Sequence, residues 1–190
     1  EQRGTGHAVM QTEDVFSAYE GTILVAAGDA AYLTKSDLAS LVNHHQQTGA
    51  SATLLSSIIE NPSGYGRVMR DASGKVSRII EEKDCSFQET LIKEVNSSVY
   101  CFKKHDLFDA LSQITPDNVQ GEYYLTDVIK VMAEKGLPIE AVVSKNPLAA
   151  QGINTRVQLA NAEKIFRDKI RERLMLSGVT LMDPKTTFID

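Results

Sequence analysis

Strand-like runs alternate with amphipathic segments through most of the chain. Small or apolar residues dominate runs at 22–27, 51–59 and 94–102, each of the length of one strand. Between the first two runs, residues 34–48 open with Thr-Lys-Ser-Asp and keep apolar side chains at helical spacing until Gly49. Strand, helix and strand in this order form a βαβ unit, so the first two strands are predicted to run in the same direction.

The next segments extend this alternation. Asp-Ala-Ser-Gly at 71–74 separates two short runs and predicts a β-hairpin. Helices are predicted at 106–113 and 128–135, and a further strand at 139–143. The expected fold class is therefore α/β, a sheet flanked by helices.

The pattern changes near residue 156. Residues 157–176 keep apolar positions at helical spacing with charges between them, which predicts a connecting helix that does not cover the sheet. A strand is predicted at 178–182. We therefore expect a sheet domain at 1–156, a connecting helix at 157–177, and the start of another structure at 178–190.

Composition limits the class of protein. At 190 residues the chain is long enough for one full core, and its hydrophobic content of 42% is ordinary. A formal charge of −5 argues against nucleic acid or an anionic membrane as the main partner. No apolar run approaches the ~20 residues of a membrane span, and no signal peptide is visible at the start. With two unpatterned cysteines, Cys85 and Cys101, we expect a reduced, cytoplasmic protein. The chain lacks an initiator methionine, so we also expect it to be a piece of a longer protein.

Gly28 and Asp29 follow directly on the first predicted strand. In an open α/β sheet, ligands collect at the carboxyl ends of the strands. A carboxylate there is suited to hold Mg²⁺ between the protein and substrate phosphates. The alternative is that Asp29 only caps the next helix or opens a turn.

Other polar stretches fall at further strand ends, at 64–67, 81–84 and 152–156. These ends share one rim in a doubly wound sheet, so the stretches are expected to surround one ligand. Asn96 lies inside a strand among apolar residues, and a buried amide needs either structural partners or a ligand. The charges at 81–84, taken alone, are equally typical of a solvated strand end.

The sequence contains no convincing nucleophile system. Neither a Ser-His-Asp arrangement nor a cysteine with a partner histidine is apparent, and His44 and His45 fall mid-helix, where a surface position is expected. Chemistry that needs only positioning and charge neutralisation fits best, and phosphoryl or nucleotidyl transfer is of that kind.

Seven motifs, in order and at fitting spacing, then identify a family. They are Gly-Thr-Gly-His-Ala at 4–8, Ala-Gly-Asp at 27–29, Pro-Ser-Gly-Tyr-Gly-Arg at 62–67, Ile-Glu-Glu-Lys-Asp at 80–84, Glu-Val-Asn at 94–96, Gln-Gly-Glu-Tyr-Tyr-Leu-Thr-Asp at 120–127 and Gly-Ile-Asn-Thr-Arg at 152–156. Together they resemble the uridylyltransferase domain of the bacterial bifunctional N-acetylglucosamine-1-phosphate uridylyltransferase/glucosamine-1-phosphate acetyltransferases. The resemblance covers nearly the whole chain.

The resemblance implies a fold and a reaction. The fold is a Rossmann-like nucleotidyltransferase (GT-A-like) mixed sheet, with the long helix leading into the first strand of a left-handed β-helix. The reaction joins UTP and N-acetylglucosamine 1-phosphate to give UDP-N-acetylglucosamine and pyrophosphate, with Mg²⁺ as cofactor. The full-length parent would be a homotrimer assembled through the β-helix.

The resemblance also implies site residues. Asp29 and Asn154 match the metal ligands and thus the catalytic positions. Gly4 and Thr5 match contacts to uracil, and the remaining matches contact the N-acetylglucosamine moiety: Gly66, Glu81 and Asn96. No side-chain role is carried onto Ala27, where the family often has a bulkier residue.

Two departures leave alternatives open. The family's glycine-rich, basic phosphate-binding loop is absent from this sequence and would precede Glu1, so we expect the chain to be N-terminally truncated and its phosphate stabilisation reduced. Ala30 and Ala31 follow the metal ligand where the family usually has an apolar residue and proline. The alternatives are a sugar-nucleotide-binding module or trimer platform without catalysis, and a nucleotidyltransferase for another sugar 1-phosphate.

Overall fold

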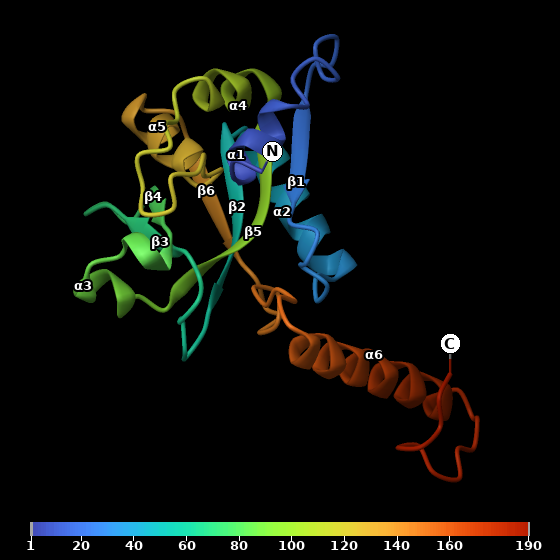
Figure 1. Ribbon diagram of the computed structural model, residues 1–190. Coiled ribbons are helices and arrows are strands. Elements are labelled where there is room, and N and C mark those ends of the chain that lie inside the picture. Colours follow the sequence, from blue (N-terminus) through green and yellow to red (C-terminus); the bar gives the residue numbers. More distant parts are fainter. Residues whose placement is uncertain (1, 190) are drawn as a thin grey trace.

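A six-stranded sheet organises residues 2–189, the part of the chain that the computed structural model describes (Figure 1). The strands are β1 (Thr22–Ala26), β2 (Ala52–Ile58), β3 (Arg67–Arg70), β4 (Val76–Ile80), β5 (Glu94–Lys103) and β6 (Ile139–Val143). The helices are α1 (Thr5–Met10), α2 (Lys35–Thr48), α3 (Phe87–Thr90), α4 (Lys104–Leu111), α5 (Asp127–Glu134) and α6 (Arg156–Leu176), with a 3₁₀ turn η1 (Glu82–Asp84). Every strand and helix predicted between residues 22 and 176 is present, with ends shifted by a few residues.

β5 is the centre of the sheet because both of its edges carry partners. Phe102 lies opposite Ile23 of β1 on one edge and opposite Ala52 of β2 on the other, and both pairings are antiparallel. β1 and β2 therefore run in the same direction, which confirms the predicted βαβ unit, but β5 lies between them. β6 continues the sheet beyond β2 as a parallel neighbour.

One edge of β5 is shared by two strands with a gap between them. β1 covers β5 from Val99 onward, and β3 begins opposite Val95. The carboxyl end of β1 thus faces the amino end of β3 across residues 96–98. In this gap Ser98 has a φ of +54°, the left-handed conformation that β-strands do not use. The gap is where the polar strand ends meet.

Helices cover both faces of the sheet, so the core has two parts. On one face, apolar side chains of β2 and β5 pack against α4 and α5, for example Leu54 and Phe102 with Leu107 and Ile129. On the other face, the alternate residues of the same strands pack against α2 through Leu41. β2 is buried along almost its whole length because both of its faces are covered.

α2 begins with a capping box that also anchors the end of β6. The Thr34 hydroxyl accepts from the Asp37 amide, and the Asp37 carboxylate accepts from the Thr34 amide at 2.9 Å. The same carboxylate accepts from the Ser144 hydroxyl at 2.6 Å. Burial raises the pKa of Asp37, but the hydrogen bonds from Ser144, Thr34 and Asn146 together lower it below its ordinary value of 3.8.

Replacing Asp37 by asparagine is expected to lower the free energy of unfolding at pH 7 by about 2 kcal/mol, because a helix cap and a charged hydrogen bond are weakened. Since the folded-state pKa lies below the unfolded-state value, the carboxylate stabilises the fold above that value and loses this effect as the pH falls through the folded-state pKa. Urea denaturation at pH 7 and at acid pH should therefore show the difference narrowing in acid. The exposed Asp117→Asn is the control, and an equal loss at both pH values would contradict the role of the charge.

His45 corrects a prediction. It was expected at the surface, but it is 2% exposed and its Nδ1 lies 2.8 Å from the Thr53 hydroxyl of β2. Burial lowers the pKa of His45. His45 lies one helical turn after Leu41, on the side of α2 that packs on the sheet, so the general surface preference of histidine, and not the helical spacing, gave the wrong prediction.

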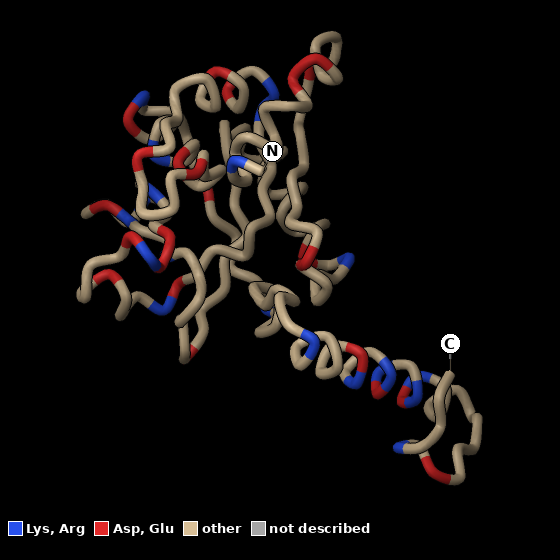
Figure 2. Tube along the Cα trace, viewed as in Figure 1, with Lys and Arg blue, Asp and Glu red and all other residues tan. Residues whose placement is uncertain are grey.

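α6 projects away from the sheet and carries acidic and basic side chains along its length (Figures 1 and 2). Halfway along the helix, Phe166 stacks on Tyr32, with ring centroids 5.9 Å apart. Within the described chain, no helix combines the length and the apolar content that crossing a membrane requires. That α6 connects two domains stays a prediction.

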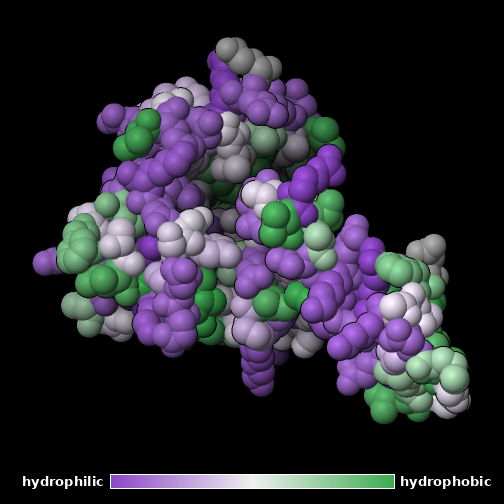
Figure 3. All heavy atoms as spheres, turned by 60° about the horizontal axis from the view of Figure 1, so that its bottom comes forward, coloured by the Kyte–Doolittle hydropathy of each residue, from purple (hydrophilic) through white to green (hydrophobic). Residues whose placement is uncertain are grey.

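The segment after α6 contains no strand among residues 177–189, so the strand predicted at 178–182 is wrong for this chain. The segment instead returns along α6, where Arg171 donates to the carbonyls of Lys185 and Thr187. A strand of a β-helix depends on neighbouring coils for its hydrogen bonds, and the described chain provides none. Hydrophobic side chains of this segment lie exposed near the far end of α6 (Figure 3), including Met182 and Phe188.

Candidate active site

A small cavity of about 140 Å³ lies at the gap in the edge of β5. Five of the seven residues singled out from the sequence line it, although they are spread from position 29 to position 154: Asp29, Gly66, Glu81, Asn96 and Asn154. The end of β1, the start of β3, the end of β4, the middle of β5 and the loop before α6 each contribute one. The sheet topology therefore brings together the rim that the sequence predicted.

Asp29 and Asn154 lie on either side of Gly152. A Cβ atom built on Gly152 would be 2.5 Å from Asp29 Oδ2 and 3.4 Å from Asn154 Nδ2. The two segments are also joined by the Ile153 amide, which donates to the Asp29 carbonyl at 3.2 Å. Only glycine leaves room for the carboxylate here, so the turn at Gly152 sets how closely the two side chains approach.

The turn after Asp29 is closed by the backbone. The Ala30 amide donates to the Ala27 carbonyl at 3.2 Å, and the Ala31 amide donates to the Asp29 carbonyl at 2.9 Å. A proline at position 31 would have no N–H to donate. The Ala31 amide therefore helps to close this turn, which the proline usual in the family could not do.

The donor set of Asp29 and Asn154 fits Mg²⁺. Both side chains are exposed to solvent and supply carboxylate and amide oxygens, the ligands that hard cations prefer. Among residues 2–189, no group of three or more His, Cys, Asp or Glu side chains is placed to hold a metal. An ion at Asp29 and Asn154 would thus need water or substrate phosphates for its other ligands, as is usual for Mg²⁺ in phosphoryl-transfer sites. Their role as metal ligands stays a prediction.

Gly66 and Glu81 lie against each other in the lining of the smaller cavity. A Cβ atom on Gly66 would lie 3.4 Å from Glu81 Oε2, so glycine keeps this wall open beside the carboxylate. Glu81 accepts from the Thr126 hydroxyl at 3.1 Å. Burial raises the pKa of Glu81, and the nearby carboxylates of Asp127 and Asp84 raise it further, although the Thr126 hydrogen bond opposes them.

Asn96 is buried and held by protein groups. Its Nδ2 donates to the Tyr100 hydroxyl at 2.6 Å, and its Oδ1 accepts from the Ser98 amide at 3.1 Å. Burial raises the pKa of Tyr100, which keeps the hydroxyl neutral. Protein groups thus provide the structural partners that a buried Asn96 needs, but one N–H and one lone pair of its amide remain for a ligand.

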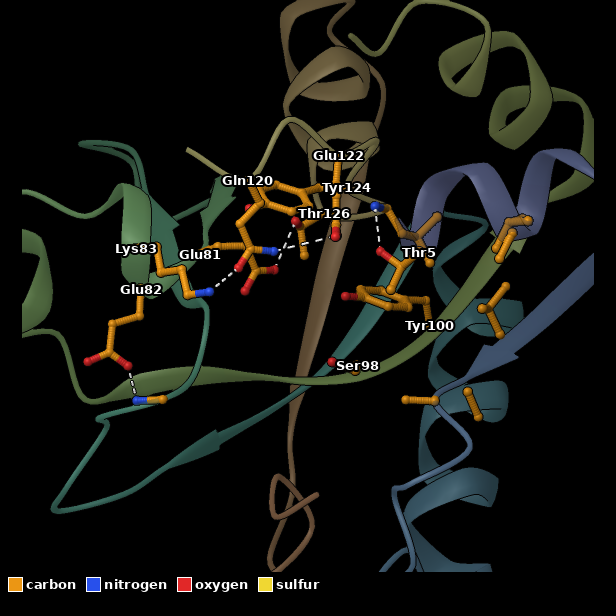
Figure 4. Close-up of a pocket in the computed structure, with 17 residues that line it drawn as sticks. Thr5, Glu81, Glu82, Lys83, Ser98, Tyr100, Gln120, Glu122, Tyr124 and Thr126 are labelled. Atoms are coloured by element: carbon orange, nitrogen blue, oxygen red, sulfur yellow. Dashed lines mark hydrogen bonds between the residues drawn. The ribbon is translucent and has the colours of Figure 1, made fainter. Parts of the chain in front are cut away.

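A larger cavity of about 790 Å³ adjoins the first and shares with it Ala27, Gly64, Glu81 and Ser98 (Figure 4). Thr5 lies on its wall, and its hydroxyl accepts from the Leu125 amide at 3.0 Å. Gly4 precedes it with a φ of +103°, and a Cβ atom there would lie 2.5 Å from the Tyr123 carbonyl. Thr5, near the start of the chain, and Asn154, near its end, therefore line two cavities that adjoin each other.

Sequence reasoning missed several lining residues. Tyr124 and Thr126 project into the larger cavity from the segment before α5, and Lys83 and Gln120 close one side of it (Figure 4). Burial raises the pKa of Tyr124 to about 12, with the Asp84 carboxylate the second cause. These residues belong to two of the seven motifs, so the sequence did mark them. The residues beside them in the sequence gave no indication of what their side chains do.

These features define a nucleotidyl transferase. The model of the nucleotidyl transferase family matches residues 1–147, and the chain belongs to that family.

More particular similarity comes from curated relatives. The chain is 47% identical over 190 residues to the bifunctional protein GlmU of Pelotomaculum thermopropionicum, covering all of this chain and 42% of the relative. It is 48% identical over 189 residues to the bifunctional protein GlmU of Caldanaerobacter subterraneus subsp. tengcongensis, of which it covers 41%. The chain thus spans about two fifths of the length of the curated relatives it matches. These matches confirm the family resemblance drawn from the seven motifs.

The fold is shared with more distant proteins. A crystal structure of UDP-glucose pyrophosphorylase complexed with UDP-glucose matches with a TM-score of 0.70 and 17% sequence identity, over 89% of this chain and 64% of that one. At this identity the likeness concerns the fold alone. It confirms the predicted Rossmann-like nucleotidyltransferase architecture, without the start of a β-helix.

Proposed function

We propose that the protein catalyses Mg²⁺-dependent uridylyl transfer from UTP to N-acetylglucosamine 1-phosphate, giving UDP-N-acetylglucosamine and pyrophosphate. Family membership and the similarity to bifunctional GlmU proteins support nucleotidyl transfer to a sugar phosphate. The observation that carries the proposal is the convergence of five dispersed candidate residues on one cavity.

In this proposal the larger cavity binds the uracil and the smaller one binds the N-acetylglucosamine moiety. Thr5, on the wall of the larger cavity, and Gly4, which precedes it, contact the uracil in this proposal. The N-acetylglucosamine moiety contacts Gly66, Glu81 and Asn96, whose side chains and backbone supply hydroxyl and amide partners. Asp29 and Asn154 are the catalytic pair in this proposal, because they would hold Mg²⁺ beside the phosphates.

The transfer needs no covalent intermediate on the protein. A phosphate oxygen of the sugar phosphate attacks the α-phosphorus of UTP, and the bond from that phosphorus to the pyrophosphate oxygen breaks, so atoms and charge balance without a protein proton. Bound Mg²⁺ would neutralise charge on the phosphates. The chain's own residues hold the two substrates in line, the main protein contribution in a reaction of this kind.

The proposal extends to the longer protein. UDP-N-acetylglucosamine is a precursor of the cell envelope, so we place the protein in the cytoplasm, in peptidoglycan and lipopolysaccharide precursor synthesis. We also infer a homotrimer for the full-length protein. UTP, N-acetylglucosamine 1-phosphate and UDP-N-acetylglucosamine are its proposed partners, with no nucleic acid or membrane partner.

A pyrophosphate-release assay on the full-length protein encoded by the gene tests the proposed function. We expect release with UTP and N-acetylglucosamine 1-phosphate, much less with glucose 1-phosphate, and none after Mg²⁺ is chelated. Preference for glucose 1-phosphate would point to another sugar substrate. Binding of UDP-N-acetylglucosamine without release would point to a non-catalytic binding module.

A further inference from the structure

Glu82 lies next to the proposed sugar contact Glu81 but is turned toward a different part of the site. Its carboxylate accepts from the Ser63 hydroxyl at 3.1 Å and from the Gly64 amide. Figure 4 shows the Glu82 carboxylate pointing away from the side of the cavity where Glu81 meets Thr126. Glu82 therefore binds the loop that precedes β3.

Arg67, the first residue of β3, contacts the same loop from the protein interior. Its side chain is 1% exposed, and it donates to the Tyr65 carbonyl and, at 3.4 Å, to the Thr90 carbonyl. A buried cation requires a carboxylate or several acceptors nearby. Among the described residues, Glu82 is the only carboxylate within 4.0 Å of this guanidinium.

In the loop between β2 and β3, Gly66 is held to β5 by the Asn96 amide, which donates to the Gly66 carbonyl at 2.9 Å, and the Tyr65 amide donates within the loop to the Pro62 carbonyl at 3.2 Å. Gly64 has a φ of +89°, and Gly66 follows two residues later, so the backbone is intrinsically free at both positions. Gly64 lines both cavities and Gly66 lines the smaller one. The position of this wall therefore depends on contacts from outside the loop, which Glu82 and Arg67 supply at three successive residues, 63–65.

η1 also reaches the opposite wall of the larger cavity. Lys83 Nζ donates to Gln120 Oε1 (Figure 4). Asp84 Oδ1 accepts from the Val119 amide at 3.0 Å. Consecutive residues of one short turn thus tie together the two walls between which the ligand would lie. Glu82 is the member of the turn that holds the loop before β3, whose Gly64 lines both cavities.

We propose that Glu82 is a positioning residue for the sugar-phosphate half of the site. It holds the loop at 63–65, with Arg67, so that Gly66 lies against Glu81 at the position the sugar needs. This inference rests on the proposed function. It predicts a selective effect, because the proposed uracil contacts Gly4 and Thr5 lie on other segments and do not touch this loop.

The test is steady-state kinetics of the full-length protein with Glu82→Ala and Glu82→Gln. Glu82→Ala removes both loop contacts and is expected to raise KM for N-acetylglucosamine 1-phosphate about tenfold, with KM for UTP changed less than about twofold. Glu82→Gln keeps one acceptor oxygen for the loop and should recover part of the difference. Glu89→Ala is the matched control, because Glu89 also caps a turn and pairs with an arginine, Arg78, but lines neither cavity.

The outcomes separate this inference from the proposed function. If the unmodified protein transfers no uridylyl group to the sugar phosphate, the proposed function fails. If that protein is active and Glu82→Ala lowers only the melting temperature, or raises both KM values equally, Glu82 has a merely structural role and the inference is overturned. A rise confined to the sugar phosphate, partly reversed in Glu82→Gln and absent in Glu89→Ala, supports it.

Discussion

Replacing Asp29 by alanine is expected to lower kcat/KM for uridylyl transfer by about 10²–10³-fold, the loss seen when one group that stabilises transition-state charge is removed. Asp29 is exposed and lies beside Asn154 across Gly152, so its removal leaves no buried group unpaired. Thermal stability should therefore change little. The apparent affinity for Mg²⁺, measured by titrating activity with the metal, should fall together with activity.

The comparison variants make this result specific. Asp29→Asn keeps an oxygen ligand without the charge and should retain more activity than Asp29→Ala. Asp14→Ala removes an exposed carboxylate that lines neither of the two connected cavities, and it should behave as the unmodified protein. Activity of Asp29→Ala within about twofold of the unmodified protein would contradict the proposed metal site, since loss of a ligand cannot be that small under this mechanism.

Replacing Glu81 by alanine is expected to weaken the binding of UDP-N-acetylglucosamine about 10–100-fold, which corresponds to the loss of charged hydrogen bonds to the sugar. Uridine should lose less affinity in this variant, because Glu81 lies against Gly66 in the smaller cavity, whereas the proposed uracil contact Thr5 lines only the larger one. Calorimetry with the two ligands measures the split. Equal loss of affinity for both would show that Glu81 does not contact the sugar selectively.

Glu81 also predicts a pH dependence. Burial, reinforced by Asp127 and Asp84, raises its pKa above the ordinary value of 4.5. The ionised carboxylate accepts hydrogen bonds from sugar hydroxyls, so affinity should fall as the pH drops through this raised pKa. UDP-N-acetylglucosamine suits the measurement because its diphosphate does not titrate near neutral pH. Glu81→Gln should bind weakly at all pH values and lose the dependence; a dependence retained in this variant would assign it to another group.

The hydrophobic pattern predicted most of the secondary structure because periodicity is a local property. It placed β1, α2 and β2 in order and gave β1 and β2 a common direction, which the register confirms. It did not place β5 between them, since the pairing partner of a strand is chosen by the packing of the whole chain. His45 was misjudged because the general surface preference of histidine was given more weight than its helical spacing from Leu41. The strand at 178–182 was wrong because a strand needs a neighbour, and the described chain has none after α6.

The contacts of the charged residues at 81–84 could not be predicted from the local sequence. A charged run after a strand is typical of solvated surface, and the sequence marked Glu81 only through the family resemblance. In the structure Glu82 binds Gly64, and Lys83 and Asp84 bind the adjacent residues Gln120 and Val119 of a second segment. Those partners lie 18 to 37 positions away, too far for any pattern of spacing to associate them.

By itself, the sequence determined the elements, the α/β class, the family and a set of candidate residues that included Asp29 and Asn154. Only the tertiary structure decided that these two lie against one glycine, that β1 and β3 leave a gap on the same edge of β5, and that five candidates line the cavity there. Asp29 and Asn154, 125 positions apart, come near each other because the Ile153 amide donates to the Asp29 carbonyl at 3.2 Å and Gly152 has no Cβ against the carboxylate. That arrangement depends on long-range packing, which no local pattern of hydrophobic and polar residues encodes.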